Sequence, residues 1–517
     1  MRKSPDDVGW FFVCYDQLNH NIFPWSNGNR AENGLIFIES KAKGDSLNYH
    51  QQKLALLLSN MRHFAKESED LGHPVKYYYT DGNYCDLLTE IICDLGPINL
   101  VEPAERSMRI ELKSLIDEKK LLIHQHDGWL TKREWFSETV GNEPPFRMDR
   151  FYKRVRKETG VLMQDGKPMG DKFSFDAENR LPWKGDPETQ SDIIFEVDQI
   201  DMEVMELVRS KFADHPGDCD LSKVPTTLQQ NHQLLRWAMK NMQYFGPYED
   251  AMSSKSRYLF HSKLAISTNL SRLSAKEVVD SALMTDAPLN CLEGFYRQLI
   301  WREYVKHVHD VTDGFRSLGV YDIQSNQPNF LQQNNPLPDA YWGKKSGFNC
   351  LDTVVESVMD DGWTHHIPRL MVLSNFASLL DINPRKLTTW FHEAFIDAYD
   401  WVVEPNVLGM GTYSLGSAMM TKPYVSGTPY INKMSDYCKS CKFNPKKDCK
   451  VSNLYWAFLE RHKDSFEGNI RMAMPLRSLA KRSADKKSED IEAYQDIIRA
   501  LSNGQEYVAN CEIKSLV

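Results

Sequence analysis

The stretch YHQQKLALLLSNMRHFAK, residues 49–66, lies between two short apolar runs, LIFI at 35–38 and VKYYY at 75–79. Its apolar residues recur at the three- and four-residue spacing of one helix face, whereas the flanking runs have the length of buried strands. A strand, a helix and a strand in this order predict a βαβ unit with parallel strands. The beginning of the chain is therefore assigned to the α/β class.

The same alternation extends in both directions from this unit. WFFVCY at 10–15 predicts an earlier strand, and we expect a helix over 84–95, a strand over 99–102 and a helix over 107–118. No GxGxxG follows the first strand, so an ordinary dinucleotide-binding fingerprint is absent from the sequence. We predict a doubly wound parallel sheet over residues 1–130.

Periodicity weakens over residues 131–225, where Gly, Pro, Asp and Lys are frequent. Phe173, Phe175 and Trp183 are too many aromatic residues for a disordered tail, so we predict an ordered connector. Over residues 226–517 the pattern is helical almost throughout and strand signals disappear. The predicted architecture is an α/β domain followed by a larger all-α domain, since 517 residues exceed what one compact core holds.

The composition is that of a globular protein, with 41% hydrophobic residues, 26% charged residues and a formal net charge of −9. This charge argues against nucleic-acid binding over the whole surface, while a local basic face stays compatible with it. No apolar run approaches the ~18–20 residues that cross a bilayer, and the first residues do not resemble a signal peptide. We expect a cytoplasmic protein without a membrane partner.

Three cysteines, Cys438, Cys441 and Cys449, fall within twelve residues, and Cys350 is the candidate for a fourth member of the group. In a reducing cytosol they are not expected to form disulfides. Short spacings let thiolates converge on one inorganic centre at little cost in loop entropy. The residues alone leave structural zinc and an iron–sulfur cluster equally open, with unligated surface cysteines as a third interpretation.

Seven segments of the sequence are considered together, in the order in which they occur along the chain. They include RQLIWREYV (297–305), THHIPRLMVLSNFA (364–377) and TKPYVSGTPYINKMSDYCKSC (421–441), and the other four are 15–18, 53–65, 146–180 and 397–414. Together these segments resemble the iron–sulfur bacterial branch of the photolyase/cryptochrome family, and its (6-4) photolyases in particular. The resemblance implies light-driven repair of (6-4) photoproducts in UV-damaged DNA, by electron transfer from reduced FAD, and a monomer. It also implies a 4Fe–4S cluster on Cys350, Cys438, Cys441 and Cys449 and a 6,7-dimethyl-8-ribityllumazine antenna in the α/β domain.

On this resemblance, one set of residues holds FAD. Arg369 and Asp397 match an ion pair against the isoalloxazine ring, although the residues alone would suggest a plain salt bridge between helices. Arg302 matches a position that neutralises the pyrophosphate, for which a forked guanidinium is suited. The other expected contacts are His261, Ser262 and Asn269 near the phosphates, and Asn406 and Met410 along the ring. Val403 or Glu404 should lie near flavin N5, and the choice stays open.

Recharging the flavin requires oxidisable aromatic side chains that lead to the surface. Trp390 and Trp342 match the relay of the family, with core packing as the alternative for Trp342. Relatives often carry tyrosine where this chain has Phe391, which is not readily oxidised. Tyr399 or Tyr430 is expected to substitute for it.

A damaged dinucleotide must leave the duplex to reach a buried flavin. His365 and His366, in THHIPRL, would transfer a proton near neutral pH, and the resemblance places His366 over the flavin. A bare His–His pair would more often cap a helix or bind a metal. Tyr424 and Gln298 match further lesion-facing positions. Since cyclobutane-dimer photolyases typically have an acid at the position of Gln298, the amide favours the (6-4) lesion.

Asp16 and Glu39 stand at the ends of the first two predicted strands, where doubly wound sheets bind ligands. They resemble antenna contacts of the family, with strand-end capping as the alternative. Two basic runs are candidates for contact with DNA phosphates, although such runs are often only solvated faces. They comprise Arg147, Arg150, Lys153, Arg154, Arg156 and Lys157, and then Arg477, Lys481, Arg482, Lys486 and Lys487.

A blue-light photoreceptor of cryptochrome type, with the same cofactors and no repair, is the main alternative. Phe391 and the TYSLGSAMM stretch (412–420), where relatives often carry Asp-Gly-Gly, keep that alternative open, whereas His365, His366 and Tyr424 favour repair. An iron–sulfur DNA-binding protein of primase type, without flavin, is the third function considered.

Overall fold

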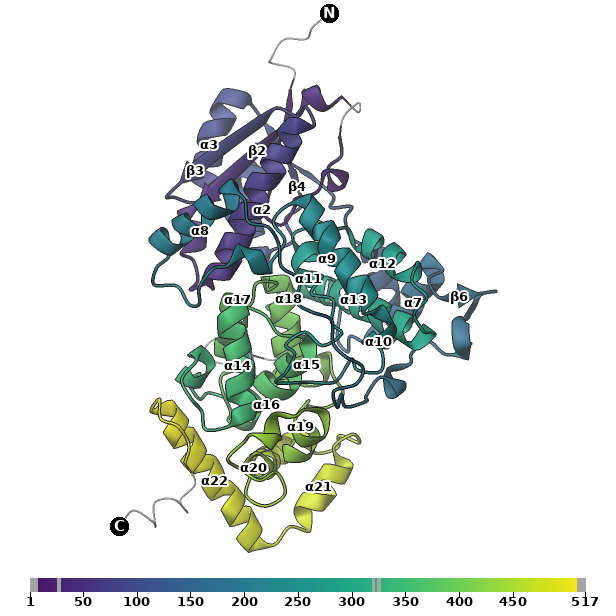
Figure 1. The fold of residues 1–517 in the computed structure, drawn as a ribbon, viewed down its shortest axis with the longest axis vertical. Coiled ribbons are helices and arrows are strands. Elements are labelled where there is room, and N and C mark those ends of the chain that lie inside the picture. The colour runs from purple at the N-terminus through teal and green to yellow at the C-terminus, as the bar shows by residue number, and fades with distance from the viewer. Residues whose placement is uncertain (1–7, 26–28, 319–320, 323–326, 509–517) are drawn as a thin grey trace, which may run out of the picture.

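The computed structural model describes residues 8–25, 29–318, 321–322 and 327–508 (Figure 1). The N-terminal α/β part forms one end of the molecule, and the helices of the C-terminal part extend from it to α22 (Ala484–Ser502) at the other end. The predicted order, an α/β domain followed by a larger helical part, is confirmed.

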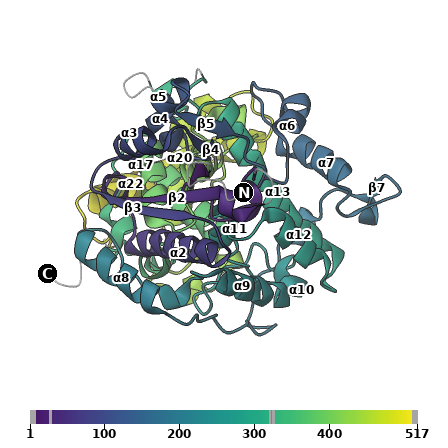
Figure 2. The ribbon, with the colours of Figure 1, turned by 90° about the horizontal axis from the view of Figure 1, so that it is seen from above.

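Five parallel strands form the N-terminal sheet in the order β3-β2-β1-β4-β5. They are β1 (Gly9–Phe12), β2 (Asn33–Ser40), β3 (Val75–Thr80), β4 (Ile98–Val101) and β5 (Leu121–His124). One face is covered by α2 (Gln51–Asp70) and the other by α3 (Tyr84–Leu95), as Figure 2 shows. Helices on both faces bury β2 completely, which explains its continuous apolar run. The doubly wound sheet is as predicted.

Two details of this domain differ from the prediction. The single helix expected over 107–118 is two short helices, α4 (Arg106–Glu111) and α5 (Lys113–Asp117). Leu112 between them turns the chain with ψ at −2° and buries its side chain in the core under the sheet. The strand β5 was not predicted, because it is an edge strand with exposed Leu122 and Ile123 and has no buried run.

Residues 131–225 pack against both parts of the molecule. They contain α6 (Arg133–Thr139), α7 (Met148–Thr159) and α8 (Gln199–Lys211), and a short hairpin of β6 (Met163–Gln164) and β7 (Lys167–Pro168). α7 contacts α13 (Leu289–Val311) of the helical part, whereas α8 lies along α2 (Figure 1). The connector is ordered, as predicted. Its expected limits, 131 and 225, stay a prediction.

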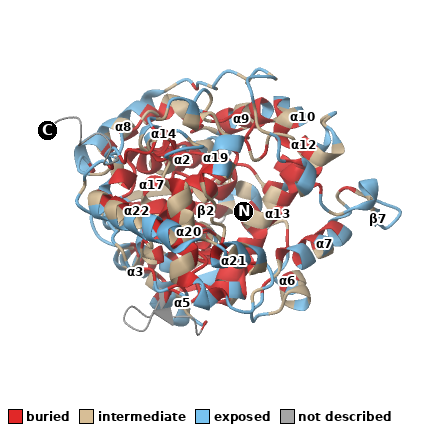
Figure 3. Cartoon of the chain, turned by 90° about the horizontal axis from the view of Figure 1, so that it is seen from below, coloured by how far each residue is buried: buried red, intermediate tan, exposed pale blue. Residues whose placement is uncertain are grey.

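The remaining α-helices described are α1 (Lys41–Gly44) of the sheet domain and, in the helical part, α9 (Leu228–Lys240), α10 (Met242–Phe245), α11 (Ala265–Asn269), α12 (Ala275–Leu283), α14 (Asn349–Asp361), α15 (His366–Pro368), α16 (Asn375–Leu379), α17 (Pro384–Ala394), α18 (Asp400–Glu404), α19 (Thr428–Met434), α20 (Val451–His462) and α21 (Ala473–Ala480). One hairpin, β8 (Tyr321–Asp322) with β9 (Gln327–Pro328), corrects the expectation that strands are absent here; two residues a strand are too few to show a period. Buried residues fill the interior of the helical part, and the β6–β7 hairpin is exposed at its edge (Figure 3).

Two segments of the helical part are wound as π-helix, η8 (Arg369–Ser374) and η9 (Pro405–Gly411). Pro368 precedes the first and Pro405 opens the second, and proline has no N–H to continue the α-helical ladder. At the end of η9, Thr412 N donates to the carbonyl of Val407, five residues back, at 2.9 Å. Wider turns of this kind often accompany functional sites.

Lys53 of α2 connects the sheet domain to the helical part. Its ammonium donates to the carbonyl oxygens of His392 (2.8 Å) and Ala398 (2.6 Å), and the residue is 3% exposed. Burial lowers the pKa of Lys53 well below its ordinary value. Because a buried cation needs acceptors, these two bonds fix α2 against the segment 392–398. None of the described helices is both long and apolar enough to span a bilayer.

Candidate active site

A bidentate ion pair joins Arg369, at the start of η8, to Asp397, in the turn after α17. The two terminal guanidinium nitrogens donate to the two carboxylate oxygens at 2.9 Å each, and Nε donates to the carbonyl of Thr364 at 2.7 Å. The guanidinium lies 4.3 Å from the centre of the Phe395 ring. Two parallel bonds fix the direction of both side chains as well as their charge.

Two further predicted residues are hydrogen-bonded to this pair. Asn269 donates through Nδ2 to the backbone carbonyl of Asp397 (2.8 Å), and its Oδ1 accepts from Nε of Arg302 (2.8 Å). Burial lowers the pKa of Arg302, while the carboxylate of Glu303 at 3.0 Å opposes that shift. The structure thus brings Arg302, Asn269, Asp397 and Arg369 into one hydrogen-bonded row.

Two tryptophans beside Arg302 were missed from the sequence. The guanidinium carbon of Arg302 lies 4.5 Å from the ring centre of Trp129 and 5.2 Å from that of Trp401, which meet each other edge to face. Contacts of this kind add to the stabilisation that the Glu303 carboxylate gives this desolvated cation. Trp129 and Trp401 lie far apart in the sequence, so no local motif indicated them.

The other residues predicted around the ring lie on or near η9. Asn406 is exposed although Pro405 and Val407 beside it are buried, and its Nδ2 donates to the carbonyl of Val402 (2.8 Å). Met410, four residues on, is partly buried. Ser262, predicted near the phosphates, is also partly buried, and its hydroxyl accepts from Leu264 N (3.3 Å).

Of the two candidates for the position near N5, Glu404 takes part in an ion-pair cluster. Burial opposes its ionisation, but a hydrogen bond from His309 and the charges of Arg385 and Arg316 lower the pKa of Glu404 far below its usual range. Arg385 is 2.6 Å away. Val403 packs into the hydrophobic core of the helical part. The choice between the two stays a prediction.

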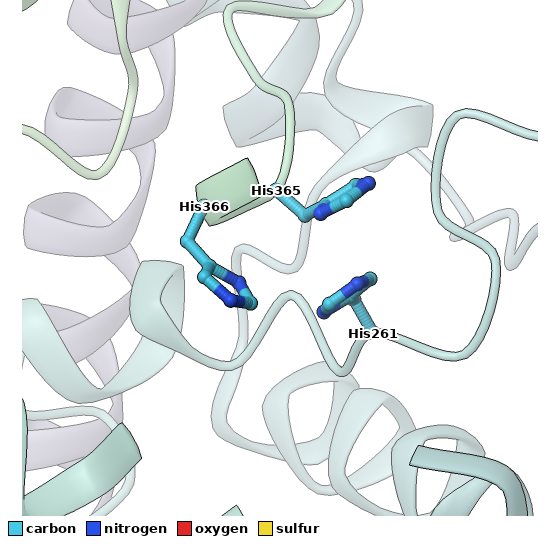
Figure 4. A group of neighbouring side chains, drawn as sticks. All are labelled: His261, His365 and His366. Atoms are coloured by element: carbon cyan, nitrogen blue, oxygen red, sulfur yellow. The ribbon is translucent and has the colours of Figure 1, made fainter. Parts of the chain in front are cut away.

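His261, His365 and His366 form one group, in which a ring nitrogen of each lies within 4.8 Å of those of the other two (Figure 4). The rings of His261 and His365 are stacked, with centres 3.9 Å apart and planes at 14°, and His366 meets His261 edge-on at 5.4 Å. His261 was predicted near the FAD phosphates. The structure places it against the two histidines predicted for the lesion pocket.

These three histidines are uncharged at neutral pH. Burial lowers the pKa of His366 to about 3, helped by the positive charges of Arg297 and Arg369. Burial also lowers the pKa values of His261 and His365 well below the ordinary value. Nε2 of His261 and Nδ1 of His365 are buried without a hydrogen-bond partner in the described part of the chain.

Gln298 and Tyr424, the other predicted lesion contacts, adjoin a row of charges that the sequence did not reveal. Gln298 donates to Glu249. Arg297 contacts Glu249 (3.3 Å) and Asp176 of the connector (3.4 Å). The negative charge of Asp176 acts on both His366 and Tyr424. The pKa of Tyr424 is raised, mainly by burial and also by Asp176. The connector therefore contributes charge to the same region as the histidine group.

The predicted relay tryptophans lie next to each other. The rings of Trp390 and Trp342 are 6.3 Å apart, and Trp390 is buried while Trp342 is partly exposed. Trp390 also contacts Phe395, the ring beneath Arg369, at 5.7 Å. A row of aromatic rings thus leads from the ion pair outward. Tyr399 lies elsewhere, stacked on Trp401 at 6.2 Å, and Tyr430 stands on α19.

The four predicted cluster cysteines lie close enough to interact. Burial and the other three thiols raise the pKa of Cys350 well above its ordinary value. The hydroxyl of Thr428 donates to Sγ of Cys449 at 3.3 Å.

A cavity of about 280 Å³ lies at the carboxyl ends of β2 and β3. Its lining includes Glu39, Tyr79, Lys53, Phe212 and Tyr399. The carboxylate of Glu39 is held by Arg62 (2.7 Å) and by the hydroxyl of Tyr77 (2.6 Å). Asp16, the second predicted antenna residue, lies outside this lining; the hydroxyl of Ser271 donates to its backbone carbonyl, and burial raises the pKa of Asp16 to about 6.

The basic runs are only partly available to DNA. Arg156 is fully buried and donates to the carbonyl oxygens of Val161 (3.3 Å) and Phe173 (2.9 Å), so it cannot contact a phosphate. Arg147 donates to backbone oxygens of residues 417–419. The exposed side chains of the first run are Arg150, Lys153 and Lys157. In the second run, Arg482 pairs with Asp490 and Lys487 with Glu460.

Comparison with known proteins relates the chain to DNA photolyases. Residues 11–223 match the family "Deoxyribodipyrimidine photo-lyase-related protein", and residues 295–446 match the "FAD binding domain of DNA photolyase". The chain is 32% identical over 497 residues to a protein of Agrobacterium fabrum named "(6-4) photolyase", which covers 92% of this chain and 96% of that relative.

Two solved structures share the fold. One is a bacterial class III photolyase from Agrobacterium tumefaciens, with a TM-score of 0.56 and 13% identity over 96% of this chain and 99% of that one. The other is an archaeal photolyase from Sulfolobus tokodaii with two FAD molecules, with a TM-score of 0.55 and 11% identity over 94% and 99%. At these identities the likeness concerns the fold alone.

We expect the protein to lose stability as the pH falls from about 7.5 to about 5.5. His261 and His365 stay neutral in the folded state, whereas each binds a proton in the unfolded chain below about pH 6.5, so acid favours unfolding. Each should cost about 1 kcal/mol at pH 5.5. His365→Phe should flatten the dependence of Tm on pH, and His232→Gln, a surface control, should not. An unchanged slope in His365→Phe would show that His365 is charged in the fold.

Proposed function

The chain belongs to the DNA photolyase family, and on that premise we propose that it repairs (6-4) photoproducts in UV-damaged DNA in the light. The observation that carries the proposal is the environment of His366. It is a neutral imidazole, three residues from the Arg369–Asp397 pair and within electrostatic reach of Arg297 and Asp176. A proton acceptor therefore stands beside the residues that would orient the flavin.

FAD would be held by the hydrogen-bonded row described above. A buried guanidinium at Arg302, with the amide of Asn269 beside it, suits two phosphates, since a forked cation donates to their oxygens in parallel. The Arg369–Asp397 pair offers the ring a fixed charge of each sign, and the exposed amide of Asn406 offers a donor and an acceptor. When bound in its reduced form, FAD supplies the electron that light transfers to the lesion.

The chain itself supplies the binding of the extruded lesion and the movement of a proton. Extrusion costs least at a damaged, poorly stacked base, which favours the lesion over intact DNA. Neutral His366 accepts the proton of the lesion's hydroxyl while the hydroxyl oxygen moves back to C4 of the 3′ base. After the bond between the two bases breaks, it delivers that proton to N3 of the 3′ base, so both bases are restored and no net proton is consumed. Arg150, Lys153 and Lys157 are the exposed cations of α7 that would contact phosphates.

Trp390 and Trp342 would form the route by which electrons reach the flavin site. Their contact, and that of Trp390 with Phe395 beneath Arg369, supports this order. Phe391 packs on Phe395 at 5.1 Å and so occupies core space beside the route. Partly exposed Trp342 would then be the outermost member.

Cys350, Cys438, Cys441 and Cys449 would ligate a 4Fe–4S cluster. The support is their mutual electrostatic interaction, which places the thiol of Cys350 near those of the other three cysteines. Burial raises the pKa values of Cys350, Cys438 and Cys449, so the thiolates need the positive charge of a metal centre to form.

The lumazine antenna would occupy the cavity at the ends of β2 and β3. At about 280 Å³ the cavity is at the small end of ligand sites, which suits a bicyclic ring with a short polyol better than a dinucleotide. Glu39 offers an acceptor whose direction is fixed by Arg62 and Tyr77.

The repair function is tested by illuminating the reduced protein with an oligonucleotide that contains one (6-4) photoproduct. Wild type should restore the intact bases, and His366→Ala should slow repair at least about 100-fold at equal lesion binding, because general base catalysis is lost. His232→Ala is the matched control. No repair by FAD-loaded wild type would favour the blue-light photoreceptor.

Cys350→Ser should abolish the broad visible absorbance of an iron–sulfur centre and lower Tm by several degrees, because Cys350 connects α14 to the loop that carries the other three ligands. Cys219→Ser, at another buried cysteine, should keep the absorbance. One tightly bound zinc equivalent or no bound metal, with no iron by metal analysis, would exclude the cluster.

Glu39→Gln should weaken retention of 6,7-dimethyl-8-ribityllumazine about tenfold, because it removes a charged hydrogen-bond acceptor. Fluorescence of the pigment released from the purified protein measures the loading. Asp16→Asn lies outside the cavity lining and serves as the control. Equal loss in both variants, or none in either, would place the pigment outside this cavity.

A further inference from the structure

Two histidines of the group in Figure 4 stand behind the one that meets the lesion. His366 is partly exposed, whereas His261 and His365, whose rings lie beside it in Figure 4, are each 5% exposed. Their unpartnered atoms, Nε2 of His261 and Nδ1 of His365, belong to the histidine group whose ring nitrogens lie within 4.8 Å of one another. Buried polar atoms without a partner are rare in folded proteins and call for a functional explanation.

A neutral imidazole carries one proton on either of its two nitrogens, and only the bare nitrogen is a base. Which nitrogen is bare depends on the hydrogen bond that the other one makes. For His366 to accept a proton from the lesion, its inward nitrogen must carry the hydrogen and donate it to an acceptor behind it.

The charged groups that face His366 cannot serve as that acceptor. Arg297 and Arg369 are donors only, and Asp176 already pairs with Arg180 and Arg297. His365 faces Arg369 and the other two histidines, and His261 faces His366. Phe245, edge-on to His261 at 5.7 Å, is apolar. Nε2 of His261 and Nδ1 of His365, which have no hydrogen-bond partner among the described residues, are the possible acceptors that remain among these neighbours.

We propose that His261 and His365 are positioning residues that hold His366 in the tautomer whose outward nitrogen is the free base. The inference rests on the proposed role of His366 in repair, but it concerns a state of the protein before the lesion binds. It assigns His261 a role in orienting His366 in place of the contact with the FAD phosphates that was expected from the sequence. A separation of up to 4.8 Å closes to a hydrogen bond by a small side-chain rotation, and catalytic hydrogen bonds are often long before the substrate arrives.

A divalent metal ion is the competing occupant of three histidines. Zinc at about 2.0–2.1 Å from each nitrogen would require the nitrogens to lie about 3.4 Å apart. The rings of His261 and His365 lie in nearly parallel planes, at 14° with centres 3.9 Å apart, so one ion cannot lie in the plane of both rings, as imidazole ligation requires. The observations therefore favour hydrogen bonding within the group.

Long-range ¹H–¹⁵N spectra of the full-length, FAD-loaded protein with ¹⁵N-labelled histidine rings report the tautomer directly. The His366 signals are identified by their loss in His366→Phe. We expect one tautomer in wild type and a mixture of both in His261→Phe. The repair yield of His261→Phe should fall about tenfold at unchanged FAD content, and His261→Gln, which keeps an acceptor, should recover most of it.

The same single tautomer in wild type and in His261→Phe would overturn the inference, as would saturable displacement of all three ring signals by one equivalent of Zn²⁺. If His261→Phe does not retain FAD, His365→Phe is measured in its place, with the same expected mixture. Failure of the wild type to repair the lesion would contradict the proposed function. The tautomer spectrum tests the positioning role of His261 and His365 independently of repair.

Discussion

The paired hydrogen bonds between Arg369 and Asp397 determine where the rest of the site lies. Asp397 accepts Asn269 on its backbone carbonyl, and Asn269 in turn orients Arg302, so one end of the row is set. Arg369 follows His366 by three residues in the same short helical segment, which sets the other end. Burying such a pair contributes little net stability, because desolvation offsets the attraction. Its value here is directional, since it relates Arg302, the proposed phosphate-binding residue, to His366, the proposed proton acceptor.

The backbone around this pair departs from regular α-helix at the positions that the site uses. Pro368 and Pro405 each interrupt the ladder, and the π-helical turns that follow carry Arg369 and Asn406. A wider turn rotates the side chains that come after it relative to an α-helix. His365 is the extended residue before α15 and His366 is the first residue of that helix, so the two adjacent rings are oriented differently: one stacks on His261 while the other meets it edge-on.

Local patterns in the sequence were sufficient to predict the doubly wound sheet and most helices, whereas the resemblance to photolyases was needed to predict the Arg369–Asp397 ion pair. Strands with buried apolar runs, such as β2, were found, whereas the exposed edge strand β5 and the break at Leu112 were not. Motif resemblance identified residues within single segments. It did not find Trp129 beside Trp401 or the place of Asp176, because these depend on contacts between distant segments. Arg156 was a candidate for contact with DNA because it lies in a basic run, but such a run does not reveal which of its members is buried.

The side chain of Lys53 joins the sheet domain to the helical part. It donates to the backbone carbonyls of His392 and Ala398, which lie on either side of Asp397 in the sequence. Tyr399 and Lys53 both belong to the wall of the pigment-sized cavity. The cavity and the ion pair therefore share one stretch of chain, and the two hydrogen bonds of the buried Lys53 side chain fix the distance between them. Excitation passed through space between two pigments weakens steeply with distance. A fixed distance would therefore keep the transfer efficiency uniform from molecule to molecule.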